Sequence, residues 1–436
     1  MQASVRRATA FALVATLGVG EPVLGPVMAV PFALIAVIAR VTSQGPIFEV
    51  FARPGERLEG ELTGLIGFAL GATALALLTA LSDLPATVFV ATVLLLGYGD
   101  LGEALLEEGL GLTGEFNRLL GFLVGGTVIA TLGQLLIGMF GGPTVATPVI
   151  VFLSLVGTLL AALLRATLAH RDDPLVLLPV ALALWLVFSI GIEVTATQLA
   201  VAVVVTSAFG YLSWTLDTAS ISGLLTGMFI SLATIVFGGF GWFGILITFF
   251  GVGGLASKYR YDEKAARGVA EGNQGARASS NVLGNAAVAL LAVLGFAAGP
   301  QLSANPDLFR FAFAGTLATA TSDTLSSEIG SLYGPTRLIT TFELVEPGTD
   351  GGVTWQGELA GFVGAGIIAG LASILLGFSS VGAGVVVVAG VIGMTVDSLL
   401  GASIEGGWIG NQTVNFFATL AGGIVGPLIA VLVGLV

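Results

Sequence analysis

The sequence contains no cysteine and a single histidine, and these two absences exclude several kinds of chemistry. Without cysteine the chain can form neither a disulfide framework nor a thiolate nucleophile. His170 lies in the polar segment RATLAHRDDP, which is typical of a solvated loop rather than of a general base. A GxxxxGK[ST] phosphate loop, an HExxH motif and a nucleic-acid-binding signature are also missing, so no nucleic-acid partner is expected.

Charged residues are scarce as well. They make up 10% of the chain, against about 25% in soluble domains, while 55% of the residues are hydrophobic and the mean hydropathy is +1.01. Runs such as Leu119–Ile137 and Val145–Leu164 approach the roughly 20 apolar residues that cross a bilayer as a helix. These runs do not alternate as membrane β-strands do. The composition predicts an all-α, multi-pass integral protein of the cell membrane, a polytopic helical bundle of about fifteen transmembrane helices.

The basic residues indicate how the chain is oriented. If the N-terminus is placed inside, every Lys and Arg except Arg310 falls on one side of the membrane. Since cytoplasmic loops carry an excess of basic residues, we expect a cytoplasmic N-terminus. The same assignment places Asp323, Glu328 and Asp397 at cytoplasmic helix ends. Transporters usually place polar groups near the midplane, so this one-sided arrangement favours an enzyme with a cytosolic co-substrate.

Two apolar helices are predicted to carry carboxylates. The segment ATATSDTLSSEIG ends a membrane-length stretch and contains Asp323 and Glu328, and GMTVDSLLGA contains Asp397. Ionisable groups at membrane depth cost roughly 2.5–3.5 kcal/mol each, which favours a functional role. Asp323 and Glu328 lie about 140° apart on a helix and need not share a ligand. We predict that Asp323 and Asp397 bind Mg²⁺ against phosphate oxygens, with Glu328 as a further catalytic candidate. Hydrogen bonding to neighbouring helices is the alternative.

Basic and amide groups supply the candidate phosphate ligands. Arg337 has a guanidinium suited to phosphate, and the turn at Asp350, Gly351 and Gly352 favours an anion-binding concavity of backbone N–H groups. An ordinary connection between two helices is the alternative for this loop. Two helix faces are also predicted to bear polar groups at i,i+4 spacing, and unpaired amides at membrane depth are costly. These groups are Arg277, Asn281 and Asn285 on one helix, and Asn411 and Asn415 on another.

The first half contains a comparable polar helix. Asp100, Glu103 and Glu107 form a carboxylate stripe at i+3 and i+4 spacing, and Arg118 follows. This layout loosely resembles that of Asp323 and the loop after it. We therefore divide the chain into an N-terminal membrane region, 1–173, and a catalytic membrane region, 174–436. A vestigial module, a regulatory module and a second active site all remain possible for the first.

Five ordered blocks in the second half carry a family resemblance. They are KAARGVAEGNQGARASSNVLGN, ATATSDTLSSEIG, PTRLITT, VEPGTDGGVT and DSLLGA…GNQTVNF. The sequence resembles the transmembrane protein 19 family, also called domain of unknown function 92, which includes a plant phytyl-phosphate kinase. The resemblance places Thr349 and Asp350 on motif positions together with the residues above. The first half is more distantly similar to polyprenol and phytol kinases through Gly99-Asp100 and Arg118…Gly121, but lacks the lysine expected near the second element.

The resemblance and the residue chemistry together imply a membrane-embedded phosphotransferase. The expected activity is an isoprenyl (phytyl or geranylgeranyl) monophosphate kinase that uses a nucleoside triphosphate and Mg²⁺ at the cytoplasmic face. Asp323, Glu328, Arg337 and Arg277 are the catalytic candidates, and Asn281, Asn285, Thr349, Asp350, Gly351, Gly352, Asn411 and Asn415 are the phosphate-binding candidates. A nucleotidyltransferase that forms a CDP-lipid, or a transporter or scramblase, remains the alternative. The oligomeric state is open.

Overall fold

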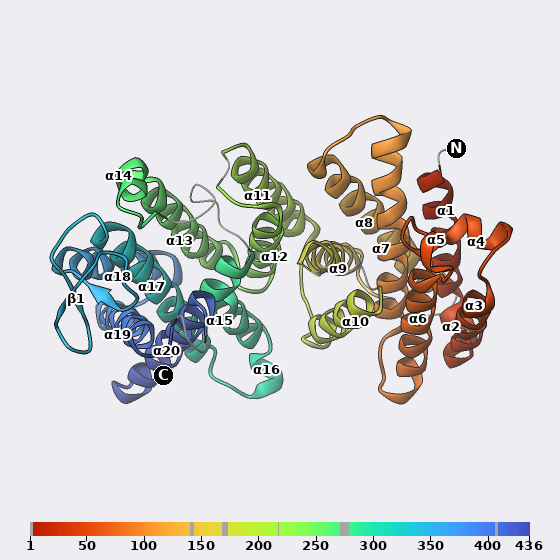
Figure 1. Ribbon diagram of the computed structural model, residues 1–436. Coiled ribbons are helices and arrows are strands. Elements are labelled where there is room, and N and C mark those ends of the chain that lie inside the picture. Colours follow the sequence, from red (N-terminus) through yellow and green to blue (C-terminus); the bar gives the residue numbers. More distant parts are fainter. Residues whose placement is uncertain (1–2, 140–143, 168–172, 217, 271–278, 406–408) are drawn as a thin grey trace. The chain divides into compact units, whose positions relative to one another are not determined.

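The computed structural model describes residues 3–139, 144–167, 173–216, 218–270, 279–405 and 409–436, and these are almost entirely helical (Figure 1). The predicted all-α polytopic fold is confirmed. The chain forms two compact units, Met1–Ala200 and Val201–Val436. The division into an N-terminal region, 1–173, and a catalytic region, 174–436, stays a prediction.

The N-terminal unit is a set of helices joined by short turns. Its elements in chain order are α1 (Ala3–Thr16), η1 (Leu17–Gly20), α2 (Glu21–Leu24), η2 (Gly25–Met28), α3 (Ala29–Val41), α4 (Pro46–Phe51), α5 (Glu56–Glu59), α6 (Thr63–Leu81), α7 (Ala86–Ala104), η3 (Leu105–Gly109), α8 (Glu115–Met139), α9 (Thr147–Thr167) and α10 (Asp173–Ser189). The next helix, α11 (Ala196–Thr215), crosses the boundary between the two units.

The C-terminal unit combines long helices with one small sheet. Its elements are α12 (Ile221–Phe237), α13 (Phe240–Lys258), α14 (Tyr261–Ala266), α15 (Ser279–Ala297), α16 (Gly299–Leu302), α17 (Pro306–Gly330), β1 (Thr336–Leu338), β2 (Leu344–Val345), β3 (Gly352–Val353), α18 (Trp355–Leu376), α19 (Ser380–Ile404) and α20 (Asn411–Leu432). The sheet is antiparallel with the order β2-β1-β3, and it replaces the loop that we expected between Ser331 and Gln356.

Helix lengths agree approximately with the expected number of membrane spans. Within the described ranges, ten helical segments are long and apolar enough to cross a bilayer, and three shorter apolar helices accompany them. Helix α17 has 25 residues but is not among these segments. It carries Asp307, Arg310, Asp323 and Glu328. A helix this polar is stable at membrane depth only when protein surrounds it.

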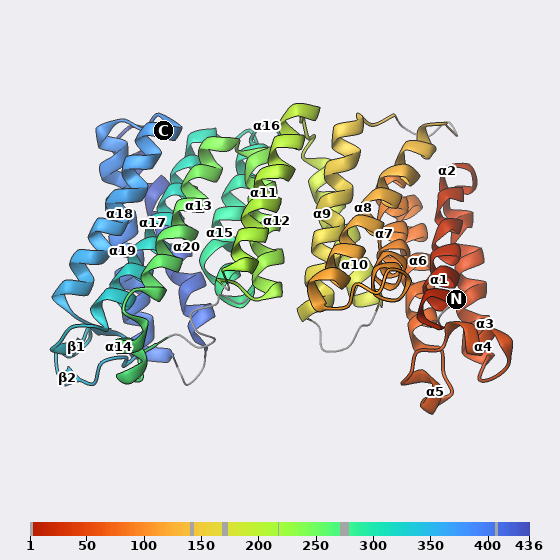
Figure 2. The ribbon, with the colours of Figure 1, turned by 90° about the horizontal axis from the view of Figure 1, so that it is seen from above.

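Polar connections in the C-terminal unit gather at one end of the bundle. Helices α13, α17 and α19 end there, and α15, α18 and α20 begin there, because consecutive long helices run in opposite directions. Figure 2 shows α14, β1 and β2 at this end, and α16 and the C-terminus at the other. Asp323, Glu328 and Asp397 therefore share one end, as expected, while Arg310 lies near the start of α17 at the opposite end. Which end faces the cytoplasm remains a prediction.

Helix α17 lies at the centre of this unit and packs against α13, α15, α18, α19 and α20. Its residues from Phe313 to Ser322 are buried without a break. Small residues allow the neighbouring backbones to approach closely. A Cβ atom on Gly393 of α19 would lie 2.1 Å from the Thr319 hydroxyl oxygen, and one on Gly422 of α20 would lie 2.0 Å from it. No side chain larger than hydrogen fits at either contact.

Candidate functional site

Two carboxyl groups from neighbouring helices face each other at the polar end of the bundle. Asp323 lies one turn after Thr319 on α17, and Asp397 lies one turn after Gly393 on α19. The close helix contact just described therefore brings the two carboxyl groups within hydrogen-bonding reach of one another. The Asp397 Oδ2 atom is buried and has no hydrogen-bond partner. Two facing carboxylates repel each other, so this pair needs a shared proton or a bound cation.

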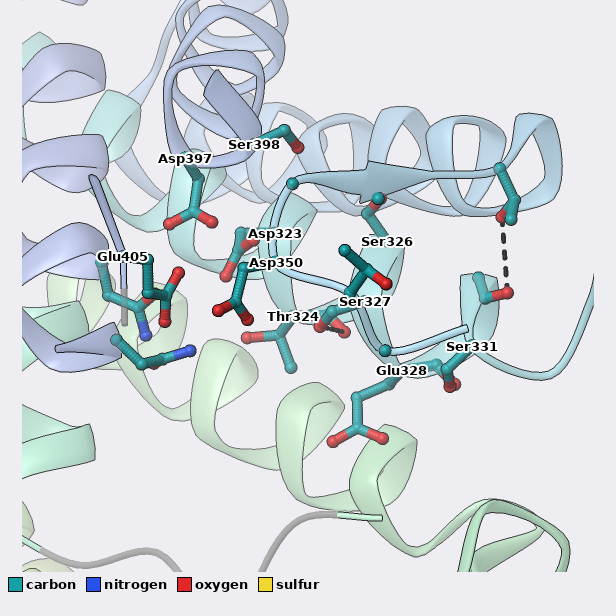
Figure 3. Close-up of a pocket in the computed structure, with 18 of the residues that line it drawn as sticks. Asp323, Thr324, Ser326, Ser327, Glu328, Ser331, Asp350, Asp397, Ser398 and Glu405 are labelled. Carbon is teal, nitrogen blue, oxygen red and sulfur yellow. Dashed lines mark hydrogen bonds between the residues drawn. The ribbon is translucent and has the colours of Figure 1, made fainter. Parts of the chain in front are cut away.

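The pair opens into a cavity of about 230 Å³. The described residues that line it are all polar or glycine. They come from α15, α17, α19, α20, the connection between α17 and α18, and the connection after α19. Figure 3 shows Asp350 and Glu405 projecting toward the same space as Asp323 and Asp397. Most of the predicted site residues line this cavity: Asn281, Asn285, Asp323, Glu328, Thr349, Asp350, Gly351, Gly352, Asp397, Asn411 and Asn415.

Glu328 belongs to the wall of the cavity but its carboxylate has a different partner. It forms a buried ion pair with Lys264, whose side chain is 1% exposed. The Lys264 Nζ also donates to the carbonyl oxygens of Ala256 (3.0 Å) and Ser257 (2.7 Å). In Figure 3 Glu328 points away from the Asp323 side of the cavity, consistent with the five-residue spacing. Glu328 therefore attaches the α14 segment to α17, which the sequence did not reveal.

Of the two predicted arginines, Arg337 does not join the cavity. Arg337 is not among its lining residues, and its Nη1 donates to the Phe342 carbonyl oxygen at 2.7 Å. This bond closes the hairpin between β1 and β2, where Arg337 pairs with Leu344. The arrangement therefore does not support the expected contact of Arg337 with phosphate. Arg277 lies outside the described residues, and its role remains a prediction.

The turn between β2 and β3 differs in detail from the predicted anion-binding concavity. Gly348 and Gly351 have φ values of +86° and +72°, which favour glycine. The Gly352 N–H donates to the Thr349 carbonyl oxygen at 2.8 Å, so this donor is already used within the turn. A Cβ on Gly351 would lie 2.4 Å from the Ala402 Cβ, which shows how tightly the turn packs on α19. The turn thus holds the Asp350 carboxylate at the cavity, and binding of an anion by the Gly351 and Gly352 backbone stays a prediction.

Glu405 is a cavity residue that the sequence reasoning missed. It caps the C-terminal end of α19 and lies between the blocks DSLLGA and GNQTVNF, a position that could have identified it. Burial raises the pKa of its carboxyl above the ordinary value, and the nearby Asp350 carboxylate raises it further, while a hydrogen bond with Asn411 lowers it. The crowding of Asp350 and Glu405 adds to the excess of negative charge in the cavity.

Amide groups line the opposite side of the cavity. The Asn281 Oδ1 accepts from the Gln412 Nε2 at 3.0 Å, and the Asn285 Nδ2 donates to the Asn281 carbonyl oxygen at 2.9 Å. The bond from Gln412 to Asn281 and the close approach of Gly284 to Gln412 hold the first turns of α15 and α20 together, whereas the Asn285 bond lies within α15. Since helix N-termini carry partial positive charge, this side favours anions. The opposite side, at the C-terminal ends of α17 and α19, favours cations.

The donor set of the cavity fits a hard divalent cation. Mg²⁺ usually takes one or two carboxylates and completes its octahedron with water and phosphate oxygens. Asp323 and Asp397 supply two carboxyl groups, and the buried Asp397 Oδ2 lacks a protein partner. Among the described residues no group of three or more His, Cys, Asp and Glu side chains is placed to hold a metal ion. A cation at this pair would therefore need ligands from water and substrate.

The N-terminal unit contains a cavity of a different kind, about 160 Å³ in volume. Arg165 of α9 forms an ion pair with Asp100 and lies 3.7 Å from the Glu103 Oε2. Arg7 and Arg53 also line this cavity. Asp100 and Glu103 of the predicted carboxylate stripe are therefore paired with arginine, and the Arg118 Nη1 lies 3.8 Å from the Glu107 Oε1.

Sequence comparison now assigns the chain to a family of proteins that span membranes. The model of the family described as "Integral membrane protein DUF92" matches residues 204–423, and the chain belongs to this family. The match covers α12 to α19 and most of α20, and thus every described residue that lines the polar cavity. It does not extend to the N-terminal unit.

The relatives come from archaea, cyanobacteria and plants. An uncharacterized membrane protein of Methanocaldococcus jannaschii is 36% identical over 214 residues, which cover 48% of this chain and 84% of the relative. An uncharacterized membrane protein of Synechocystis is 35% identical over 44% of this chain and 75% of its own length. Protein VTE6, chloroplastic, of Arabidopsis thaliana is 34% identical over 45% of this chain and 61% of its own length. No solved structure matches the chain.

Proposed function

We propose that the C-terminal unit transfers a phosphoryl group from a nucleoside triphosphate to an isoprenyl monophosphate such as phytyl or geranylgeranyl phosphate. The observation that carries the proposal is the facing pair of Asp323 and Asp397, at the polar end of a membrane bundle and beside an amide-lined wall. Membership of a family that includes a plant phytyl-phosphate kinase, the resemblance from which we started, supports the same chemistry.

The cavity divides into two electrostatic halves that match the reactants. Asp323 and Asp397 would hold Mg²⁺, which would neutralise part of the charge on the nucleotide phosphates. The amide groups of Asn281, Asn285 and Asn415 are placed to orient phosphate oxygens from the other side. Phosphoryl transfer depends mainly on such positioning and charge neutralisation, so the lack of a histidine or cysteine nucleophile is no obstacle.

The proposed reaction is a direct transfer between the two substrates and needs no covalent intermediate with the protein. A phosphate oxygen of the isoprenyl monophosphate forms a new bond to the terminal phosphorus of the nucleotide. The bond between that phosphorus and its bridging oxygen breaks, and a nucleoside diphosphate leaves. The lipid product is an isoprenyl diphosphate. Asp350 and Glu405 increase the negative charge near the bound cation and so favour its retention.

The test is an assay of the purified full-length protein with geranylgeranyl monophosphate, Mg²⁺ and ATP or CTP. We expect an isoprenyl diphosphate and a nucleoside diphosphate, and we expect Asp323→Asn to lower the rate by about a hundredfold or more. Asp307→Asn is the matched control, because Asp307 lies on the same helix at the opposite end, beside Arg310. No diphosphate from the wild type, or undiminished product from Asp323→Asn, contradicts the proposal.

The products also separate the competing activities. Release of pyrophosphate in place of a nucleoside diphosphate identifies a nucleotidyltransferase that forms a CDP-lipid. Movement of lipid across a liposome membrane without nucleotide identifies a transporter or scramblase. The gathering of the polar groups of the C-terminal unit at one end of the bundle favours the kinase over the transporter.

A further inference from the structure

A second cavity, about 100 Å³ in volume, lies between α11, α12, α13 and the first turn of α15. We refer to it as the apolar groove. Its large side chains are apolar, and its remaining residues are mainly glycine, serine and threonine. The large side chains are those of Phe209, Leu224, Met228, Ile247, Phe250 and Val282.

The apolar groove runs along the helix axes from the polar end of the bundle toward its middle. On α12 its lining extends from Gly223 to Ser231, a rise of roughly 12 Å at 1.5 Å per residue. Gly223 lies in the first turn of α12, at the end where the polar cavity lies. On α13 the lining likewise extends from Gly254, near the polar end, back to Ile247.

The first turn of α15 separates the apolar groove from the polar cavity. Asn281 and Asn285 line the polar cavity, whereas Val282, the residue after Asn281, lines the groove. The polar cavity has no apolar side chain larger than glycine among its described lining residues. It therefore offers no favourable surface to a hydrocarbon chain, and an amphiphilic substrate must place its tail elsewhere.

We propose that the apolar groove receives the isoprenoid tail of the substrate while the polar cavity holds its phosphate. This inference rests on the proposed function and adds a binding site for the tail. The groove begins beside the phosphate site and continues into the membrane, which is the course that such an amphiphile requires. The length of the groove then limits how much of the tail the protein contacts, and so contributes to chain-length selectivity.

Two glycines provide a way to obstruct the apolar groove, because neither is packed against other atoms. A Cβ on Gly227 or on Gly254 would have no heavy atom within 4 Å, so both positions border open space. A Cβ on Gly251 would be equally unobstructed, but Gly251 lies on an exposed face of α13 and does not line the groove. Gly251→Leu is therefore a matched control for Gly254→Leu on the same helix.

The experiment compares the full-length variants in liposomes with geranyl and geranylgeranyl monophosphate as acceptors. Because Gly254 lies near the polar end, where both tails would enter, we expect Gly254→Leu to lower kcat/KM for both acceptors at least tenfold, roughly what steric exclusion from an apolar pocket produces. Gly251→Leu should keep the wild-type values. Unchanged kcat/KM values for Gly254→Leu, or an equal fall for both variants, overturn the proposal while the kinase activity stands.

A binding measurement keeps the tail site testable apart from turnover. A geranylgeranyl monophosphate with a photoreactive group on the isoprene units nearest its phosphate is added without nucleotide. We expect cross-links to α11, α12 or α13 at groove residues in the wild type and in Gly251→Leu, and a loss of these cross-links in Gly254→Leu. Cross-links confined to lipid, or to other helices, contradict the tail site whether or not a kinase activity is found.

Discussion

The two units of the protein differ in what lies beside the carboxylates of their membrane helices. In the N-terminal unit, Asp100 and Glu103 lie beside Arg165, which is 14% exposed and packs over the Phe122 ring at 4.6 Å. In the C-terminal unit, Asp323 and Asp397 lie beside each other, and the cavity that they border has no described basic residue in its lining. The N-terminal helices thus supply a counter-ion, whereas none stands among the described residues that line the cavity of Asp323 and Asp397.

This difference indicates which unit requires a ligand. A carboxylate that pairs with a largely enclosed arginine is neutralised within the protein, and removing one partner leaves the other charge uncompensated. Two carboxyl groups that face each other are stabilised by a cation from solution. The first half resembles polyprenol kinases at Gly99-Asp100, but the Asp100 carboxylate is paired with Arg165. We therefore propose that the chemistry takes place in the C-terminal unit.

The largest expected effect comes from replacing one carboxylate by an amide in each unit. We expect Asp397→Asn to lower kcat by about a hundredfold or more, because the proposed Mg²⁺ site would lose one of its two carboxylates. Its thermal stability should stay equal or rise, since the repulsion with Asp323 is removed. Asp100→Asn should instead lower the unfolding temperature and keep kcat per folded molecule. The phosphoryl-transfer rate and the unfolding temperature are measured on the same preparation of each variant. A loss of kcat in Asp100→Asn but not in Asp397→Asn would place the chemistry in the N-terminal unit.

A smaller effect, on stability, is expected from the one buried ion pair that borders the polar cavity. Lys264→Met leaves the Glu328 carboxylate buried without its partner, which should cost about 3–5 kcal/mol. Lys258→Met is the control, since the Lys258 Nζ is at the surface and donates only to the Leu216 carbonyl oxygen among the bonds described. Unfolding in detergent measures the difference. If Lys264→Met and Lys258→Met prove equally stable, the pair does not anchor the α14 segment.

The smallest effect is a pH dependence at Glu405. Because burial and Asp350 raise its pKa above 4.5, the folded protein binds this proton more tightly than the unfolded chain does. Stability from Glu405 is therefore complete below pH 4.5 and is lost as the pH rises through the raised pKa. We expect Glu405→Gln to match the wild type in acid and to be slightly more stable at neutral pH in metal-free buffer. Unfolding temperatures across this range test the sign, and a wild type that gains on the variant as the pH rises contradicts it.

The residues that the sequence placed correctly are those whose positions follow from local spacing. Asp323, Asp397, Asn281 and Asn415 lie near the polar ends of long helices, and helical periodicity with the alternation of helix direction suffices to bring such ends together. The all-α fold follows from the length of the apolar runs alone. That these four residues lie around one cavity could therefore be expected without knowing which helices pack together.

Pairing between distant charged groups could not be read in this way. Lys264 and Glu328 are 64 residues apart, and only the folded path of the α14 segment decides that they meet. Arg337 was assigned to phosphate because of its type and neighbours, yet a three-stranded sheet directs it to the Phe342 carbonyl oxygen. Short strands within a polar connection give too weak a periodic pattern to predict.

The contact between Gly393 and Thr319 bears on the proposed Mg²⁺ site. Because the Gly393 backbone already lies against the Thr319 side chain, neither helix can move inward there, and this packing fixes the separation of the carboxyl groups one turn further on. A cation of another radius would have to be accommodated by rotation of the Asp323 and Asp397 side chains alone. An added methyl group at position 393 would widen that separation and shift the preference toward larger ions such as Ca²⁺.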